Sequence, residues 1–135
     1  MSRLTVTERT FFVDWKLELV AVPVSDVDRA KDFYSEKVGF QVDHDHIVND
    51  EIRFVQLTPP GSACSIAVGK GIVETSPGSV AGLQLVVPDV HEARTQLLEH
   101  GVDVGEVEEF PWGSFVFFKE PDGNRWSVQQ VPAWG

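Results

Sequence analysis

Cysteine is almost missing from this sequence, and its scarcity excludes two classes of protein. Only Cys64 is present among 135 residues, so neither an intrachain disulfide nor a CxxC pair can form. Disulfide-bonded secreted domains and cysteine-based zinc or redox motifs are therefore excluded. A single cysteine is typical of chains kept in a reducing compartment, and we expect the protein to be cytoplasmic.

Basic residues and long apolar segments are also scarce. Lysine and arginine number 11 against 21 acidic residues, and the formal net charge of -10 disfavours binding to nucleic acid or anionic lipid while favouring a cationic ligand. No 18 uncharged apolar residues run together, and the N-terminus has no apolar run of signal-peptide length. The composition predicts one soluble domain over residues 1–135, with no membrane segment.

The sequence does contain an internal repeat. The segment VAVPVSDVDRAKDFY, which begins at Val20, returns as LQLVVPDVHEARTQL, which begins at Leu83. In each copy a strand-like run meets an acidic helix cap, apolar residues follow at helical spacing, and Gly39 or Gly101 ends the helix. Three short β-rich runs follow each helix, and those after the second are VDVGEV, SFVFFKE and NRWSVQQV. The pattern predicts two βαβββ modules in tandem.

The boundaries of the modules follow from this pattern. We place the first module at residues 16–69, the linker at 70–79 and the second module at 80–131, with residues 1–14 as an extra strand or arm. A four-stranded sheet covered by one helix leaves its other face open. Two such modules would curl their open faces around a shared cavity, so the predicted fold class is α+β with a curled mixed sheet around a cavity.

Two stretches carry a resemblance to a known family. VSDVDRAKDFYSEKVGF resembles the first-helix motif of the vicinal oxygen chelate superfamily, and FFKEPDGNRWSVQQ resembles its D-P-D-G-N turn before the last strand. That superfamily includes glyoxalase I, bleomycin resistance proteins and extradiol dioxygenases, and the resemblance covers about residues 16–131. It implies a glyoxalase-like fold and leaves the reaction open, because function depends on the site.

The resemblance also implies four metal-ligand positions, one on each of four inward-facing strands. In this sequence they fall on Leu19, Gly82, Ser127 and either Ala67 or Ser65. Leucine and glycine offer no side-chain donor and serine is a weak ligand, so we predict no metal and no other cofactor. His44 and His46 share one face of a strand and form an alternative metal site, with Glu18 as a further candidate, although a solvated strand end is the favoured interpretation of the histidines.

The other inward-facing positions are mostly apolar with a few hydrogen-bonding groups, which is typical of a small-molecule pocket. Trp112, in the turn-rich segment FPWGS, is the candidate for stacking on a ligand, whereas Trp126 is predicted to lie in the core. Within residues 115–118, the side chains of one parity must pack under the helix. The predicted ligand-binding residues are Leu19, Ala67, Gln84, Trp112, Arg125, Ser127 and Gln129.

Two classes of function remain. The favoured one is a metal-free protein that binds a drug or metabolite, cationic or aromatic, without altering it, as the resemblance to bleomycin resistance proteins implies. The alternative is an enzyme of the superfamily, a lyase, isomerase or dioxygenase, with a relocated metal or with metal-independent chemistry from Arg125, Gln84, Glu120 or Asp122. A homodimer is expected, and the sequence leaves open the ligand and whether the cavity lies within one chain or between two.

Overall fold

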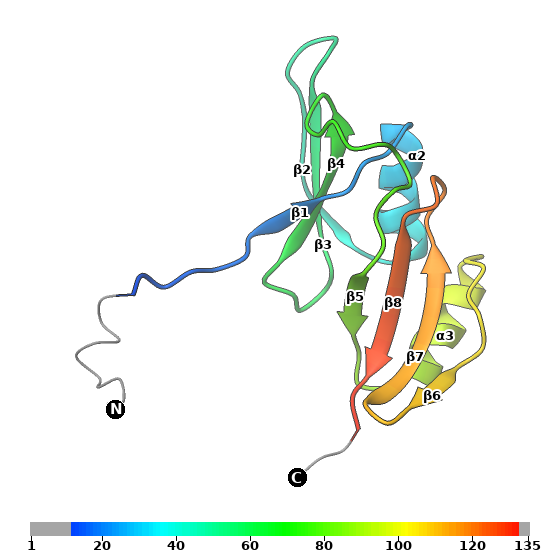
Figure 1. Cartoon of the computed structure of the whole chain (residues 1–135). Helices are drawn as coiled ribbons and strands as arrows, with labels where there is room; N and C mark the ends of the chain where they lie inside the picture. The colour runs from blue at the N-terminus through cyan, green and yellow to red at the C-terminus, as the bar shows by residue number, and fades with distance from the viewer. Residues whose placement is uncertain (1–11, 133–135) are drawn as a thin grey trace.

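The computed structural model describes residues 12–132, and within them eight strands form two four-stranded sheets (Figure 1). The first half contains β1 (Leu19–Ala21), α2 (Val27–Asp32), the π-helical segment η1 (Phe33–Lys37), β2 (Gln41–Ile47), β3 (Arg53–Thr58) and β4 (Ser65–Lys70). The second half contains β5 (Leu83–Val86), α3 (Val90–Glu99), β6 (Glu108–Phe110), β7 (Gly113–Lys119) and β8 (Arg125–Gln130). This order confirms the predicted α+β fold with a βαβββ unit in each half.

The two sheets have the same topology. In the first, β1 lies parallel to β4, and β3 and β2 follow as antiparallel neighbours. In the second, β5 lies parallel to β8, and β7 and β6 follow. One expected strand is wrong: residues 102–107 form only a single bridge, between Val104 and Phe118, and the edge strand begins at Glu108.

The predicted helix ends are present. Asp26 Oδ1 accepts a hydrogen bond from the Arg29 N–H at 3.0 Å, and Asp89 caps α3 in the same way. Gly39 and Gly101 follow the two helical segments with φ values of +90° and +81°, a left-handed conformation that is least costly without a side chain. The helix predicted up to residue 38 is shorter as an α-helix, because it widens into the π-helical segment η1 after Asp32.

One hydrophobic core joins the two halves. Tyr34 of η1 is 0% exposed, and its hydroxyl accepts a hydrogen bond from Trp126 Nε1 of β8 at 2.9 Å. Phe33 packs against Phe118 of β7 with ring centroids 6.1 Å apart. Trp126 is buried, as predicted. The helix-covered side of each sheet therefore contributes to a shared core, and the opposite side of each sheet is left open.

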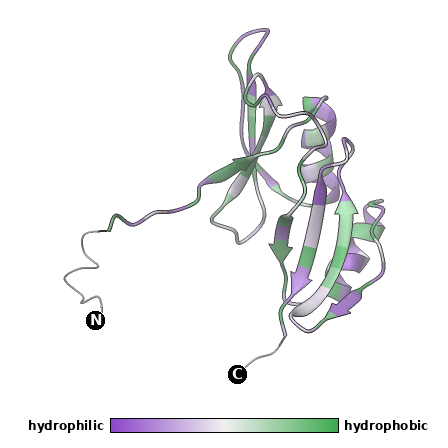
Figure 2. Ribbon diagram, in the orientation of Figure 1, coloured by the Kyte–Doolittle hydropathy of each residue, from purple (hydrophilic) through white to green (hydrophobic). Residues whose placement is uncertain are grey.

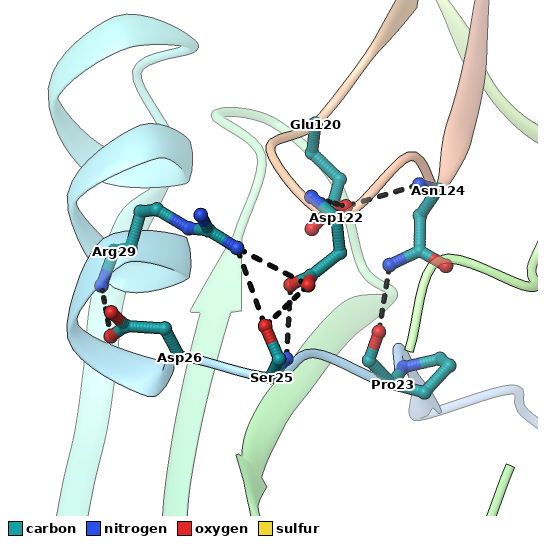
Figure 3. A network of polar contacts seen from close by, with 7 residues as sticks. All are labelled: Pro23, Ser25, Asp26, Arg29, Glu120, Asp122 and Asn124. Atoms are coloured by element: carbon teal, nitrogen blue, oxygen red, sulfur yellow. Dashed lines mark hydrogen bonds and ion pairs between the residues drawn. The ribbon is translucent and has the colours of Figure 1, made fainter. Parts of the chain in front are cut away.

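The EPDGN turn after β7 ties the second half to the first (Figure 3). Asp122 accepts hydrogen bonds from the backbone N–H and the hydroxyl of Ser25, at 3.0 and 2.5 Å, and pairs with Arg29 at 3.2 Å. The buried Asn124 side chain donates to the carbonyl of Pro23 at 2.8 Å. The turn therefore fixes the start of α2 against the end of β7.

Residues 12–18 form an extended arm that points away from both sheets, and Figure 2 shows hydrophobic residues along it. Phe12, Val13, Trp15 and Leu17 are all largely exposed. Residues 1–11 of the predicted strand or arm lie outside the described part of the chain. Among the described residues, no helix is long and apolar enough to cross a membrane.

Candidate functional site

Each sheet turns one side to the core and the other away from it. Alternate side chains of a strand point to opposite sides, and residues paired across strands share a side. Leu19 pairs with Ser65 on the first sheet, and Gln84 pairs with Ser127 on the second, all outside the core cluster. We call the side of the first sheet that contains Leu19 open face 1 and the side of the second sheet that contains Gln84 open face 2.

Open face 2 brings together five of the predicted ligand-binding residues, and hydrogen bonds join four of them. Ser127 donates to the Gln84 side-chain oxygen at 3.1 Å, and the Gln84 amide donates to the Gln129 side-chain oxygen at 2.8 Å. Gln129 Nε2 in turn donates to the backbone carbonyl of Trp112 at 3.0 Å, which fixes the turn between β6 and β7. Because each amide is oriented by its neighbour, this row presents hydrogen-bonding groups in a defined arrangement. Arg125 lies further along β8 on the same face.

Aromatic side chains form a wall beside this row. Phe110 and Trp112 are nearly parallel with ring centroids 5.2 Å apart, and Phe115 and Phe117 are nearly parallel at 5.9 Å. Phe110 also meets Phe115 edge to face at 5.6 Å, which joins the two pairs. Trp112 is 56% exposed, Phe117 42% and Phe110 37%, so three rings of this aromatic wall remain accessible.

The position of these rings follows from strand alternation. Val116 and Phe118 belong to the core, which confirms that one parity of residues 115–118 packs under the helix. Phe115 and Phe117 have the other parity and pair with Gln129 and Ser127. Alternation could assign each residue to a side of the sheet, but only the fold shows that Phe115 and Phe117 stack on each other beside the hydrogen-bonded row of Gln84, Ser127 and Gln129.

Open face 1 has a different chemical character. Leu19 and Ala67 lie on this face as expected, but the Ala67 side chain is completely buried. Polar side chains that our predicted site omitted lie on the same face: His44 pairs with Gln56, and His46 pairs with Phe54. Gln56 Nε2 donates to the Ser65 hydroxyl at 3.2 Å. Extending the parity argument to β2 and β3 would have identified these positions from the sequence.

The residues at the implied metal-ligand positions do not fit a divalent metal. The side chains of Leu19 and Ala67 have no metal-donor atom, and Gly82 precedes β5 with a left-handed φ of +94°. The hydroxyl of Ser65, the alternative to Ala67, is hydrogen-bonded to Gln56 and Thr58. Ser127 uses its hydroxyl to donate to Gln84. His44 and His46 stack with ring centroids 5.6 Å apart, but no group of three His, Cys, Asp or Glu side chains within residues 12–132 could hold a metal ion. We therefore derive no chemistry through a metal.

Glu120 and Asp122, the two carboxylates considered for acid–base chemistry, lie in the EPDGN turn that contacts Pro23 and Ser25 of the first half, and we call this contact the joint. Glu120 is 2% exposed, and its Oε1 accepts from the N–H groups of Asp122 and Asn124 at 2.7 and 3.0 Å. Burial raises the pKa of Glu120 despite these hydrogen bonds. Burial also acts to raise the pKa of Asp122, but hydrogen bonds from Ser25 and the nearby Arg29 outweigh it and lower that pKa. Asp122 thus holds the two halves together, while Glu120 fixes the shape of the turn that carries Asp122.

Two large hollows within residues 12–132 do not join the open faces. One of about 690 Å³ borders open face 2 through Phe117 and Arg125 and is also lined by Glu108 and Lys119. Another, of about 640 Å³, lies beside the turn before α2 and the loop that follows β4. Neither is lined by residues of both open faces. Open face 2 remains accessible, with Val86 66% exposed.

Comparison with known proteins agrees with this fold. The sequence profile of the Glyoxalase/Bleomycin resistance protein/Dioxygenase superfamily matches residues 16–128. YetH of Bacillus subtilis (strain 168), an uncharacterised protein, is 33% identical over 113 residues, which cover 82% of this chain and 94% of YetH.

Solved structures show the same similarity. TnmS3, an antibiotic binding protein from Streptomyces sp. CB03234, superimposes with a TM-score of 0.82 and 36% identity, covering 90% of this chain and 99% of TnmS3. A member of the same superfamily from Sphaerobacter thermophilus DSM 20745 gives a TM-score of 0.77 and 31% identity, covering 87% of this chain and 98% of that protein. From motifs, fold and relatives together, the chain belongs to the Glyoxalase/Bleomycin resistance protein/Dioxygenase superfamily.

Proposed function

We propose that this protein binds a planar aromatic small molecule on its open faces, without a metal and without changing the molecule chemically. The aromatic wall carries this proposal. Its two most exposed rings, Trp112 and Phe117, lie beside the hydrogen-bonded row of Gln84, Ser127 and Gln129. Aromatic rings stack on a flat ligand, and a few oriented polar groups set its position, which is the usual division of roles in a ligand site.

The relatives and the charge support the same function. TnmS3, which is 36% identical to this chain, is an antibiotic binding protein. The formal net charge of -10 favours ligands that carry positive charge. An enzyme would need acid–base or metal-binding groups that act together on a substrate; on open face 1, His44 and His46 stack on each other, and no third metal-binding side chain within residues 12–132 completes a metal site with them. Glu120 and Asp122 are instead held in the joint, and the implied metal positions offer no good ligand, so binding is the better-supported function.

We further propose that two copies form a homodimer in the cytoplasm and that the cavity is completed between them. The cytoplasmic location rests on the single cysteine, which is free in this structure. The dimer is supported by accessible apolar side chains on open face 2 and along the arm, where Trp15 and Leu17 are exposed. Pairing would cover these side chains and enclose a ligand between faces that one chain leaves apart.

The test uses anthracenemethanol, a neutral and fluorescent planar probe. Each of Trp112→Ala and Phe117→Ala should weaken its binding about tenfold, because the loss of one stacking ring costs on the order of 1 kcal/mol or more. Leu98→Ala is the matched control, since Leu98 is exposed on α3 and off both open faces. Equal Kd values for all three variants and the wild type, or conversion of the probe into a product, would contradict the proposal.

A further inference from the structure

A row of hydrogen bonds on open face 1 ends at a carboxylate. The Thr58 hydroxyl donates to Asp43, and Thr58 Oγ1 lies 2.6 Å from the buried Ser65 Oγ. Gln56 Nε2 donates to the same Ser65 oxygen at 3.2 Å. The contact between Asp43 and Thr58 coincides with a shift in register between Val42 and His44, which displaces Asp43 from regular alternation. We call Asp43, Gln56, Thr58 and Ser65 the polar corner.

The donor and the acceptor in each hydrogen bond of this row can be assigned. An ionised carboxylate only accepts, so the one hydroxyl hydrogen of Thr58 is used by Asp43. In the contact between the two hydroxyl groups, Ser65 must then donate, and its oxygen accepts from Gln56. Among residues 12–132, neither the Gln56 side-chain carbonyl oxygen nor the second oxygen of Asp43 accepts a hydrogen bond, so both are free to accept one from a ligand. The polar corner is therefore suited to a ligand group that donates hydrogen bonds.

Asp43 and Asp45 on β2 differ in their ion pairs. Asp45 lies two residues further along β2, points to the helix side, and pairs with Lys31 at 2.8 Å and Arg53 at 2.9 Å. Hydrogen bonds from Arg53 and then from Lys31 hold the pKa of Asp45 well below its usual range. Asp43 makes no ion pair with any residue of the described chain 12–132. A cation from outside the chain would complete this site.

We propose that the polar corner binds the ammonium group of a planar aromatic amine. This inference rests on the proposed function, including the dimer that brings an open face 1 and an open face 2 together around one ligand, and narrows the ligand from planar aromatic compounds in general to those that carry an amine. The Asp43 carboxylate attracts the positive charge, and the Gln56 carbonyl accepts one of its hydrogen bonds. His44, the cross-strand neighbour of Gln56, stacks with His46 and adds a flat surface beside the corner. Of the polar corner, only Ser65 coincides with a position that the resemblance to the superfamily implies, as the alternative metal position to Ala67.

The experiment compares two probes that differ in one group. Anthracenemethylamine carries an ammonium group at neutral pH, whereas anthracenemethanol has a neutral hydroxyl on the same ring system. Both are titrated by fluorescence into the wild type, Asp43→Asn and Asp50→Asn. Asp50 is an exposed carboxylate in the turn between β2 and β3, so Asp50→Asn removes the same charge from a different place. Melting temperatures confirm that each variant is folded.

We expect the wild type to bind the amine about tenfold more tightly than the alcohol, because the ammonium group and the Asp43 carboxylate attract each other at a partly exposed site. Asp43→Asn should remove this preference and leave the Kd of the alcohol within about twofold, while Asp50→Asn changes neither Kd by more than about twofold. Equal effects of the two variants on the amine, or no preference in the wild type, would overturn the polar corner while leaving aromatic binding intact. Failure of both probes to bind the wild type would overturn the proposed function and this inference together.

Discussion

Replacing Tyr34 by phenylalanine removes one buried oxygen atom and keeps the ring. Tyr34 is fully buried, and its hydroxyl is the acceptor for Trp126 Nε1 at 2.9 Å. Its ring stacks on Phe40 at 5.6 Å and meets Phe33 edge to face at 5.4 Å, and phenylalanine can keep both contacts. Since η1 and β8 belong to different halves, Tyr34→Phe tests a hydrogen bond that holds the halves, and hence the two open faces, in their relative positions.

The size of the effect follows from the buried donor that remains. Without the hydroxyl, the indole N–H of Trp126 has no acceptor, and an unsatisfied buried donor costs about 1–3 kcal/mol. For 135 residues, an unfolding entropy of about 2.1 cal/mol/K per residue amounts to about 0.28 kcal/mol/K. Dividing the energy by this entropy predicts a fall in melting temperature of about 4–11 °C.

Calorimetry and urea unfolding of Tyr34→Phe, Trp126→Phe and the double variant form a double-mutant cycle. In the Trp126→Phe background the indole donor is already absent, so Tyr34→Phe should cost much less there than in the wild type. A loss below about 0.5 kcal/mol in the wild-type background, or the same loss in both backgrounds, would refute the hydrogen bond as a link between the halves.

Two further predictions concern the pH dependence of stability, with opposite signs. Burial raises the folded pKa of Glu120 above its ordinary value of about 4.5, so its stabilising contribution is complete at lower pH and is lost as pH rises through the folded pKa. Glu120→Gln should abolish this decrease in the free energy of unfolding with rising pH. Asp45 has a lowered folded pKa, so its contribution is present above about pH 4 and lost on acidification. Asp45→Asn should cost about 1–2 kcal/mol at neutral pH and flatten the acid limb. Urea unfolding from pH 3 to pH 8 checks both, and wild-type slopes in the variants would contradict them.

Local features of the fold were predictable from the sequence because they depend on short-range rules. The repeated strand-to-helix sequence pattern predicted the βαβββ unit in each half, and the caps at Asp26 and Asp89 are present. Alternation along β5 and β8 correctly placed Gln84 and Ser127 on one side of the sheet. These predictions need only neighbours a few residues apart and the period of a strand.

Features that depend on distant contacts were not predictable in the same way. Tyr34 meets Trp126 only because the two halves pack through their helix-covered sides, which no local pattern reveals. The register shift near Asp43 brings it to Thr58, although simple alternation would have misplaced its side chain. The aromatic wall likewise depends on how the turn at Trp112 folds back over β7. The most informative parts of the candidate site arise from these tertiary contacts.

The most direct test of the central claim is a fluorescence titration of chelator-treated and untreated protein with anthracenemethanol. The aromatic wall and the amide row of open face 2 contain no metal ligand set, and no triad of metal-binding side chains occurs in residues 12–132. Metal-independent binding therefore predicts the same Kd before and after chelation. Loss of binding on chelation, restored by about one zinc or nickel ion per chain, would contradict the account and favour a metalloenzyme.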